Sequence, residues 1–150
     1  MENLHADITK IILQRFYAVC NALPFRLDNL IYKNALAIKL ENLGLKVETE
    51  KQFSVLYKDK EVGKLIADML VNNLVILKIT NFEIQKETEL VSKNQLSLSD
   101  KEVLLMLNFG IEGAHKRLFL TNDFKKWQLD KLIFTDINKI FTESKTDINW

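Results

Sequence analysis

Residues 62–80 read VGKLIADMLVNNLVILKIT, and this stretch decides the fold. Two apolar runs, 62–71 and 74–80, flank the dipeptide Asn72-Asn73. Asparagine tolerates a positive φ, so two asparagines between strand-forming runs predict a tight two-residue turn. The stretch therefore predicts two neighbouring antiparallel strands.

The chain before this hairpin predicts a third strand and two helices. Residues 47–57 alternate between apolar and polar side chains and end in the turn-like segment 58–60, which completes a three-stranded antiparallel meander. Apolar residues at three- and four-residue steps predict helices over 7–23 and 28–43. Asp7 and Asp28 are the expected N-caps of these helices.

The chain after the hairpin predicts one more helix and two more strands. Residues 83–98 are polar and compatible with a helix, with Ile84, Leu90 and Val91 as its apolar anchors. Residues 103–109 form a continuous apolar run, which is typical of a strand buried on both faces, and residues 117–121 predict a short final strand. The order predicts an α/β fold, with a mixed sheet flanked by helices.

Composition narrows the functional classes. The chain has 150 residues, of which 47% are hydrophobic, and a formal net charge of +1, so it is not a strongly basic protein that coats nucleic acid. Cys20 is the only cysteine, which excludes a disulfide within the chain, and we expect it to pack in the core. His115 is expected in a surface loop. The sequence shows no signal peptide and no membrane-spanning run, so we expect a cytoplasmic protein that does not bind membranes.

Several short segments, in their order and spacing, carry a family resemblance. They are Tyr32, Ala35 and Leu36, the segment GLKVE at 44–48, Tyr57, Gly63, the segment ADMLV at 67–71, NFG at 108–110, and Lys116-Arg117. Over about residues 7–121, this pattern resembles the GxxExxY proteins, a branch of the PD-(D/E)XK nuclease-like superfamily. The resemblance implies a restriction-endonuclease-like core over residues 1–122, followed by a C-terminal extension over 123–150.

The resemblance also implies what an intact site would contain. In the superfamily, carboxylates at a strand hairpin hold Mg²⁺, and a nearby lysine helps to activate water. This branch combines a helix glutamate, a motif aspartate, a Glu-x-Lys on the next strand and a glutamine on the following helix.

Most of those site residues are replaced in this sequence. The motif that names the branch falls on Arg26, Asn29 and Tyr32, so only its tyrosine remains. The motif aspartate is Asp68, and the Glu-x-Lys falls on residues 78–80, where Lys78 and Thr80 replace the glutamate and the lysine. The helix glutamine falls near Val91, and Gln95 lies one turn later.

A second register of the hairpin is possible. A shift of two residues keeps side-chain parity, places Lys78 on the motif lysine and places Ile76 on the glutamate. The second carboxylate is missing in both registers. We therefore expect no catalytic residues, no metal and no cofactor, and we interpret Asn29, Asp68, Lys78 and Thr80 as a vestigial site. One hypothesis is that the Lys78 ammonium takes the place of the metal and pairs with Asp68; the alternative is that both side chains point to solvent.

The preferred functional hypothesis is a non-catalytic protein-interaction or accessory subunit, whose partner is another protein or a second copy of this chain. The C-terminal extension is rich in apolar residues, and residues 136–143 could form a short amphipathic helix. The extension either covers the domain's own sheet or docks a partner. The candidate contact residues are Phe124, Trp127, Phe134, Phe141 and Trp150.

The alternative hypothesis is a nucleic-acid-binding protein or a residual nuclease, which would use Mg²⁺. Lys93, Lys116 and Arg117 are the candidate phosphate contacts. Acidic residues are interleaved with these cations, which is also typical of an ordinary solvated surface.

Overall fold

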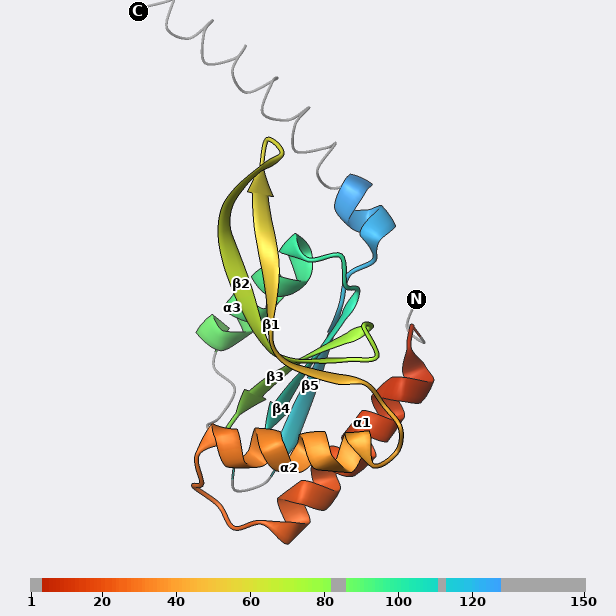
Figure 1. Ribbon diagram of the computed structural model, residues 1–150, viewed down its shortest axis with the longest axis vertical. Helices are drawn as coiled ribbons and strands as arrows, with labels where there is room; N and C mark the ends of the chain where they lie inside the picture. The colour runs from red at the N-terminus through yellow and green to blue at the C-terminus, as the bar shows by residue number, and fades with distance from the viewer. Residues whose placement is uncertain (1–3, 82–85, 111–112, 128–150) are drawn as a thin grey trace, which may run out of the picture. The chain divides into compact units, whose positions relative to one another are not determined.

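The computed structural model describes residues 4–81, 86–110 and 113–127. The chain divides into two compact units, residues 1–120 and residues 121–150. The elements of the first unit are α1 (Ala6–Ala22), α2 (Asn29–Glu41), β1 (Val47–Tyr57), β2 (Lys60–Val71), β3 (Val75–Thr80), α3 (Lys86–Leu98), β4 (Val103–Asn108) and β5 (Ala114–Phe119) (Figure 1).

The five strands form one mixed sheet in the order β1-β2-β3-β4-β5. The pairs β1–β2, β2–β3 and β4–β5 are antiparallel, whereas β3 and β4 are parallel. A parallel pair needs a crossover connection, and α3 lies in that connection. The predicted α/β fold with an antiparallel meander is therefore confirmed.

The turn at Lys58-Asp59 is confirmed, with Tyr57 paired to Lys60. The turn at Asn72-Asn73 is one residue longer than predicted, because Val71 pairs with Val75 and Leu74 belongs to the connection. Asn72 and Asn73 have φ angles of 50° and 56°, and Lys58 and Asp59 have φ angles of 51° and 64°. Two successive residues in the left-handed region form the turn whose twist matches that of the flanking strands. A strict two-residue turn would set Val71 opposite Leu74, and the additional turn residue Leu74 moves the β2–β3 register by one residue.

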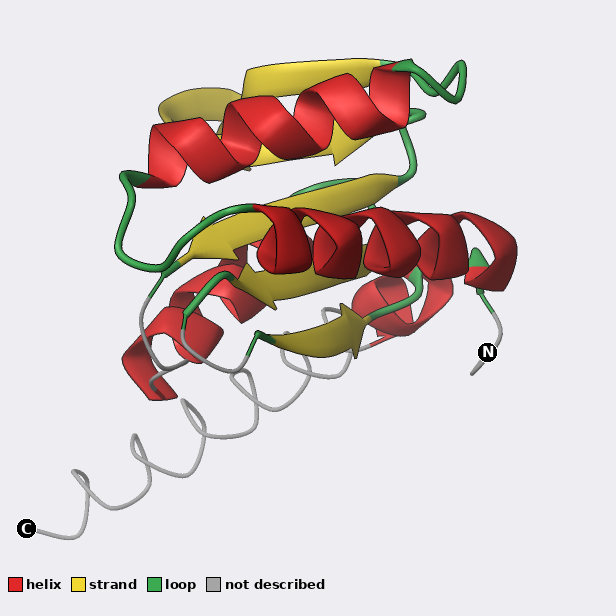
Figure 2. Cartoon of the chain, turned by 90° about the horizontal axis from the view of Figure 1, so that it is seen from below, coloured by secondary structure: helices red, strands yellow, loops and turns green. Residues whose placement is uncertain are grey.

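The sheet has a hydrophobic core on each face. On one face, α1 and α2 pack against alternate residues of β2, β3 and β4. On the other face, Leu96 of α3 packs against Leu70, Ile76, Leu104 and Met106. In Figure 2, α1 and α2 accordingly lie in front of the sheet and α3 lies behind it. The residues between these positions have side chains on the opposite face, so β4 is buried on both sides, as its sequence predicts.

The last strand differs from the prediction. It spans Ala114–Phe119 instead of 117–121. The reason is its antiparallel pairing with β4, in which Ala114 lies opposite Asn108, the last residue of β4. The side chains of Ala114, His115 and Lys116 are exposed, so the sequence there lacks the apolar alternation that marks a strand. His115 consequently lies on a strand and not in a loop.

Two details of the helices also differ. The first helix begins at Ala6 after His5, which has a left-handed backbone, so Asp7 lies within the helix and is not its N-cap. Leu90 and Val91 of α3 are exposed, and Ser92, Gln95 and Leu96 face the sheet instead. Ile84 lies outside the described residues. Over the described ranges, no helix is long and apolar enough to cross a lipid bilayer.

Candidate functional site

Asp68 and Lys78 lie side by side on the second hairpin. The β2–β3 ladder pairs Met69 with Leu77, so the next step of the same register places Asp68 opposite Lys78. The Lys78 Nζ lies 3.7 Å from Asp68 Oδ2. The hypothesised ion pair is therefore present, and the alternative register, which sets Ile76 opposite Asp68, is not the one adopted.

The Asp68 carboxylate also makes a backbone contact. Its Oδ2 accepts a hydrogen bond from the backbone N–H of Ile79 at 2.8 Å. The same oxygen thus faces both an amide hydrogen and the Lys78 ammonium. The two charged side chains are 26% and 31% exposed, so neither points freely into solvent. Asp68 therefore holds β2 to β3 through its side chain.

Thr80 and Asn29, the other two residues predicted for a vestigial site, differ in their burial. Thr80 is buried and shares the Lys78 face of β3 by strand alternation. Asn29 is the first residue of α2 and is exposed. The loop before α2 is tied to the end of β3, because the Asn81 side-chain amide donates to Leu27 O at 2.8 Å. In the described part of the chain, no hydrogen bond or ion pair joins Asn29 to Asp68 or Lys78.

A second ion pair joins α2 to β1, and the sequence interpretation missed it. Lys33 of α2 pairs with Glu50 of β1. Glu50 lies in register with Asp68, because Thr49 pairs with Met69 and Lys51 with Ala67. Lys33 is only 8% exposed, and a buried ammonium needs such a counter-charge. Counting the register back from the Lys58-Asp59 turn would have placed Glu50 opposite Ala67, because the ladder shifts by one residue between Val55 and Leu56.

These contacts do not fit a Mg²⁺ ion. Mg²⁺ prefers several oxygen ligands in a near-octahedral arrangement, usually including one or two carboxylates. Asp68 already faces the Lys78 ammonium, and Glu50, at the neighbouring register position on β1, pairs with Lys33 of α2. Among the described residues, no group of three or more histidine, cysteine, aspartate or glutamate side chains could hold a metal ion.

A second set of charges crosses the same face of the sheet. Lys78 is in register with Met106, which is in register with Lys116 of β5. The Lys116 Nζ lies 2.8 Å from Glu89 Oε2, and the Lys93 Nζ lies 3.4 Å from Glu89 Oε1. The hydrogen bond from Lys116 is the main reason why the pKa of Glu89 is below its ordinary value, and the Lys93 ammonium lowers it further.

The predicted phosphate contacts therefore divide between the two faces. Lys93 and Lys116 meet at Glu89, whereas Arg117 is the next residue on β5 and points to the opposite face. There its Nη2 donates to Leu4 O at 2.9 Å. The Glu89–Lys93 pair could be predicted from the four-residue spacing on a helix. The contact of Glu89 with Lys116 could not, because it depends on how α3 packs against β5.

Gln95, and not the residue at position 91, faces the sheet from α3. Its Nε2 donates to Ile66 O of β2 at 2.8 Å, two residues before Asp68. The exposed Val91 makes no comparable contribution. The residue of α3 that contacts β2 is therefore Gln95, one turn after the position to which the family pattern assigns the helix glutamine.

Two aromatic side chains of the C-terminal extension lie in its described part. Phe124 and Trp127 belong to the helical residues 122–127, and their ring centroids are 5.4 Å apart. Both are exposed, by 45% and 54%. Phe134, Phe141, Trp150 and the predicted helix over 136–143 lie outside the described residues.

Cys20 packs at the edge of the core. It is partly buried against the cluster formed by α1 and α2, and burial raises the pKa of its thiol. On the same side, the Tyr17 hydroxyl lies 2.7 Å from His115 Nδ1. Burial also raises the pKa of Tyr17. A raised thiol pKa disfavours the nucleophilic thiolate, which agrees with a packing role.

One comparison with known proteins gives a match. The family profile described as the PD-(D/E)XK nuclease superfamily matches residues 6–118. No curated protein and no solved structure matches the chain.

Proposed function

The chain belongs to the PD-(D/E)XK nuclease superfamily, and we propose that it is a non-catalytic member acting as a protein-interaction or accessory subunit. The observation that carries this proposal is the contact between Asp68 and Lys78. The ammonium takes the position that a second acidic ligand has in the family pattern, and it repels a cation from Asp68. Two unit charges about 4 Å apart interact by roughly 4 kcal/mol at an effective dielectric of 20.

We also propose that the chain is a degenerate member of the GxxExxY branch. Two features of the loop before α2 support this assignment. Arg26, at the position of the family glycine, has a φ of 64°, the left-handed conformation that glycine adopts most easily. Tyr32, at the position of the family tyrosine, donates its hydroxyl to Pro24 O at 2.6 Å and accepts the N–H of Leu27 at 3.2 Å.

The exposed aromatic pair supports an interaction role. Phe124 and Trp127 present two large aromatic surfaces on one helical segment. Aromatic side chains are enriched at protein–protein contacts, because they bury a large area and lose little conformational freedom. The proposed occupant of this surface is a partner protein or a second copy of the chain.

A cleavage assay tests the loss of catalysis. The full chain is incubated with single- and double-stranded DNA and RNA in the presence of Mg²⁺ or Mn²⁺, alongside the Asp68→Ala variant purified in the same way. We expect no difference in cleavage between the two proteins. Metal-dependent cleavage by the wild type that is lost in Asp68→Ala would overturn the proposal and support the residual-nuclease alternative.

A co-purification experiment tests the interaction role. Tagged full-length protein is recovered from its native host, together with a Phe124→Ala/Trp127→Ala double variant and a Tyr57→Ala control. Tyr57 is an exposed aromatic residue at the far end of β1, so it matches the chemistry of the change. We expect a stoichiometric partner, or self-association in size-exclusion chromatography, that the double variant loses and the control keeps. Equal behaviour of all three proteins would contradict the proposed contact surface.

The nucleic-acid-binding alternative predicts a different result. It predicts binding at low ionic strength that weakens as salt is added and that falls in Lys93→Gln and Lys116→Gln variants. A gel-shift titration at several salt concentrations measures this. Binding of that kind, without a co-purifying protein, would replace the accessory-subunit proposal.

A further inference from the structure

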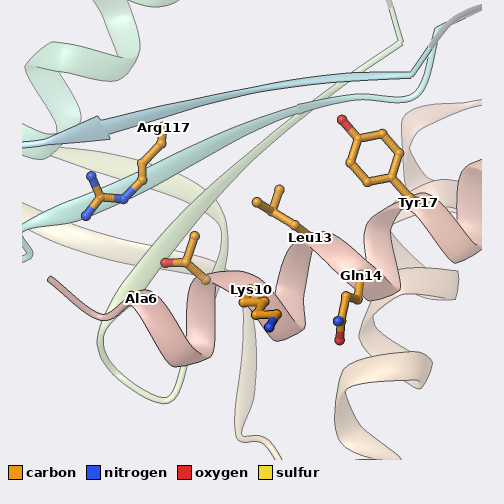
Figure 3. A pocket seen from close by; sticks show the side chains of 7 residues that line it. Ala6, Lys10, Leu13, Gln14, Tyr17 and Arg117 are labelled. Carbon is orange, nitrogen blue, oxygen red and sulfur yellow. The ribbon is translucent and has the colours of Figure 1, made fainter. Parts of the chain in front are cut away.

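A groove runs along α1 on the face of the sheet opposite Lys116. Its volume is about 540 Å³, and its surface is mainly apolar. The lining positions on α1 recur at steps of three and four residues, so they share one side of the helix, and Arg117 of β5 lies across from them (Figure 3). At 1.5 Å per residue, the stretch from residue 6 to residue 17 is about 16 Å long. The lining residues are Ala6, Thr9, Lys10, Leu13, Gln14, Tyr17 and Arg117.

Positive charge gathers toward the Ala6 end of this groove. Arg117 and Lys10 both line it, and within the described ranges neither side chain has a carboxylate at ion-pair distance. The Arg117 guanidinium uses Nη2 to reach Leu4 O and lies 5.1 Å from the Phe119 ring. A guanidinium has five donors in a planar fork, so donors remain for an anion.

A buried hydroxyl without a partner lies in the same wall. Thr9 is 6% exposed, and its Oγ1 has no hydrogen-bond partner. Buried polar side-chain atoms are normally hydrogen-bonded, because an unsatisfied one loses its interaction with water and gains nothing in return. Thr9 thus carries, in the wall that it shares with Arg117, a hydroxyl donor that the protein itself does not use and that is closed to solvent in the free protein.

We propose that this groove binds a small amphiphile with one carboxylate and an unbranched apolar chain of about ten carbons, a ligand suited to sites of this size. Arg117 donates to the carboxylate, and the Thr9 hydroxyl, which is enclosed in the free protein, turns toward it when the ligand binds. The chain lies over Leu13 toward the ring of Tyr17. The groove is on the α1 face and the Asp68–Lys78 pair is on the α3 face, so this inference does not depend on the proposed function.

Calorimetry with three ligands of equal chain length tests the proposal. The full chain is titrated with decanoate, decanol and decylammonium. We expect decanoate to bind with a dissociation constant below about 1 mM, an affinity that a ligand of this size can reach. Decylammonium, whose charge is opposite, should bind at least about tenfold more weakly. Equal affinity for the three head groups, or no measurable binding of decanoate, would overturn the proposal.

Variants locate the binding in the groove. Arg117→Gln should weaken decanoate about tenfold, because a charge-assisted hydrogen bond is lost. Arg15→Gln is the matched control, since Arg15 lies on the same helix but does not line the groove, and it should leave the affinity unchanged. Ala6→Trp places a bulky ring at an exposed position of the groove and should abolish binding without disturbing the core.

Thr9→Val separates a ligand contact from a purely structural role. The change removes the unsatisfied hydroxyl, so the thermal unfolding midpoint of the free protein should stay the same or rise. Decanoate affinity should nevertheless fall severalfold. Equal affinities for decanoate in Thr9→Val, Ala6→Trp and wild-type protein would contradict the assignment of the site.

Discussion

Tyr32 shows how one side chain organises the approach to the site. Its ring is buried and stacked on Phe109, with centroids 4.7 Å apart and planes 11° from parallel. Its hydroxyl holds the loop before α2 through Pro24 O and Leu27 N. The same loop accepts the Asn81 amide at the end of β3. Tyr32 therefore connects the start of α2 to the strand that carries Lys78.

Removing this hydroxyl has a predictable cost. Tyr32→Phe keeps the ring packing and loses one donated and one accepted hydrogen bond, so the free energy of unfolding should fall by about 1–2 kcal/mol. Urea denaturation monitored by circular dichroism measures the change. Tyr57→Phe is the control, because Tyr57 is exposed, and it should have no effect. Equal stability of both variants would contradict the tethering role of Tyr32.

At the same scale, the sequence indicated some site residues and not others. The Asp68–Lys78 pair was predicted from the family spacing through the Asn72-Asn73 turn. A strict two-residue turn would set Asp68 opposite Leu77, and the additional turn residue Leu74 brings Lys78 to that position. The Lys33–Glu50 pair could not be predicted with equal ease. Glu50 has a left-handed backbone with a φ of 51°, which interrupts strand alternation, and its partner comes from a helix instead of a neighbouring strand.

Among the elements, α3 and β5 are joined by charge as well as by apolar contacts. Glu89 of α3 forms ion pairs with Lys116 of β5 and with Lys93 of its own helix. The Glu89 side chain lies at the surface and is 21% exposed, so this link affects side-chain orientation and titration more than it adds buried interaction energy. It is also sensitive to salt.

The titration of Glu89 can be predicted with its sign. Its pKa in the folded protein is below the ordinary value of about 4.5, so the contribution of this link to stability is present above that value and is lost as the pH falls through the lowered pKa. Lys116→Met removes the main cause and should bring the pKa back toward its ordinary value. Lys93→Met should raise it less. Carboxyl-carbon NMR titration of the three proteins measures this, and an unchanged Glu89 pKa in Lys116→Met would contradict the link.

Local signals predicted most of the elements. Hairpin turns, helical periodicity and the apolar run of β4 are short-range features, and they placed both of the first helices and four of the five strands. The strand β5 was placed three residues too late, because its exposed first half is defined by backbone pairing with β4 and not by side-chain pattern. The anchors of α3 were wrong for a similar reason, since the helix buries Ser92 and Gln95 and exposes Leu90 and Val91.

For the whole molecule, the order of elements constrained the topology. The predicted order is a meander, a helix and then a buried strand. The simplest arrangement of that order places β4 parallel to β3 and next to it, and this arrangement is observed. The role of residues 123–150 stays a prediction, because apolar residues in an extension are equally compatible with covering the domain or docking a partner.

Truncation after Thr121 tests that prediction. If the extension docks a partner, residues 1–121 should retain a cooperative unfolding transition in urea and lose the partner in co-purification. If the extension instead covers the domain, the truncated chain should lose cooperative unfolding. Only the first result agrees with the proposed accessory role.

The most direct test of the central claim is a Mn²⁺ titration of the thermal unfolding midpoint. Wild-type protein should show no shift, because the Lys78 ammonium lies against Asp68. Lys78→Glu sets a second carboxylate opposite Asp68, and its midpoint should rise by a few degrees when Mn²⁺ exceeds the dissociation constant about tenfold. A rise in the wild-type midpoint that Asp68→Ala abolishes would contradict the claim that this chain has exchanged its metal site for an ion pair.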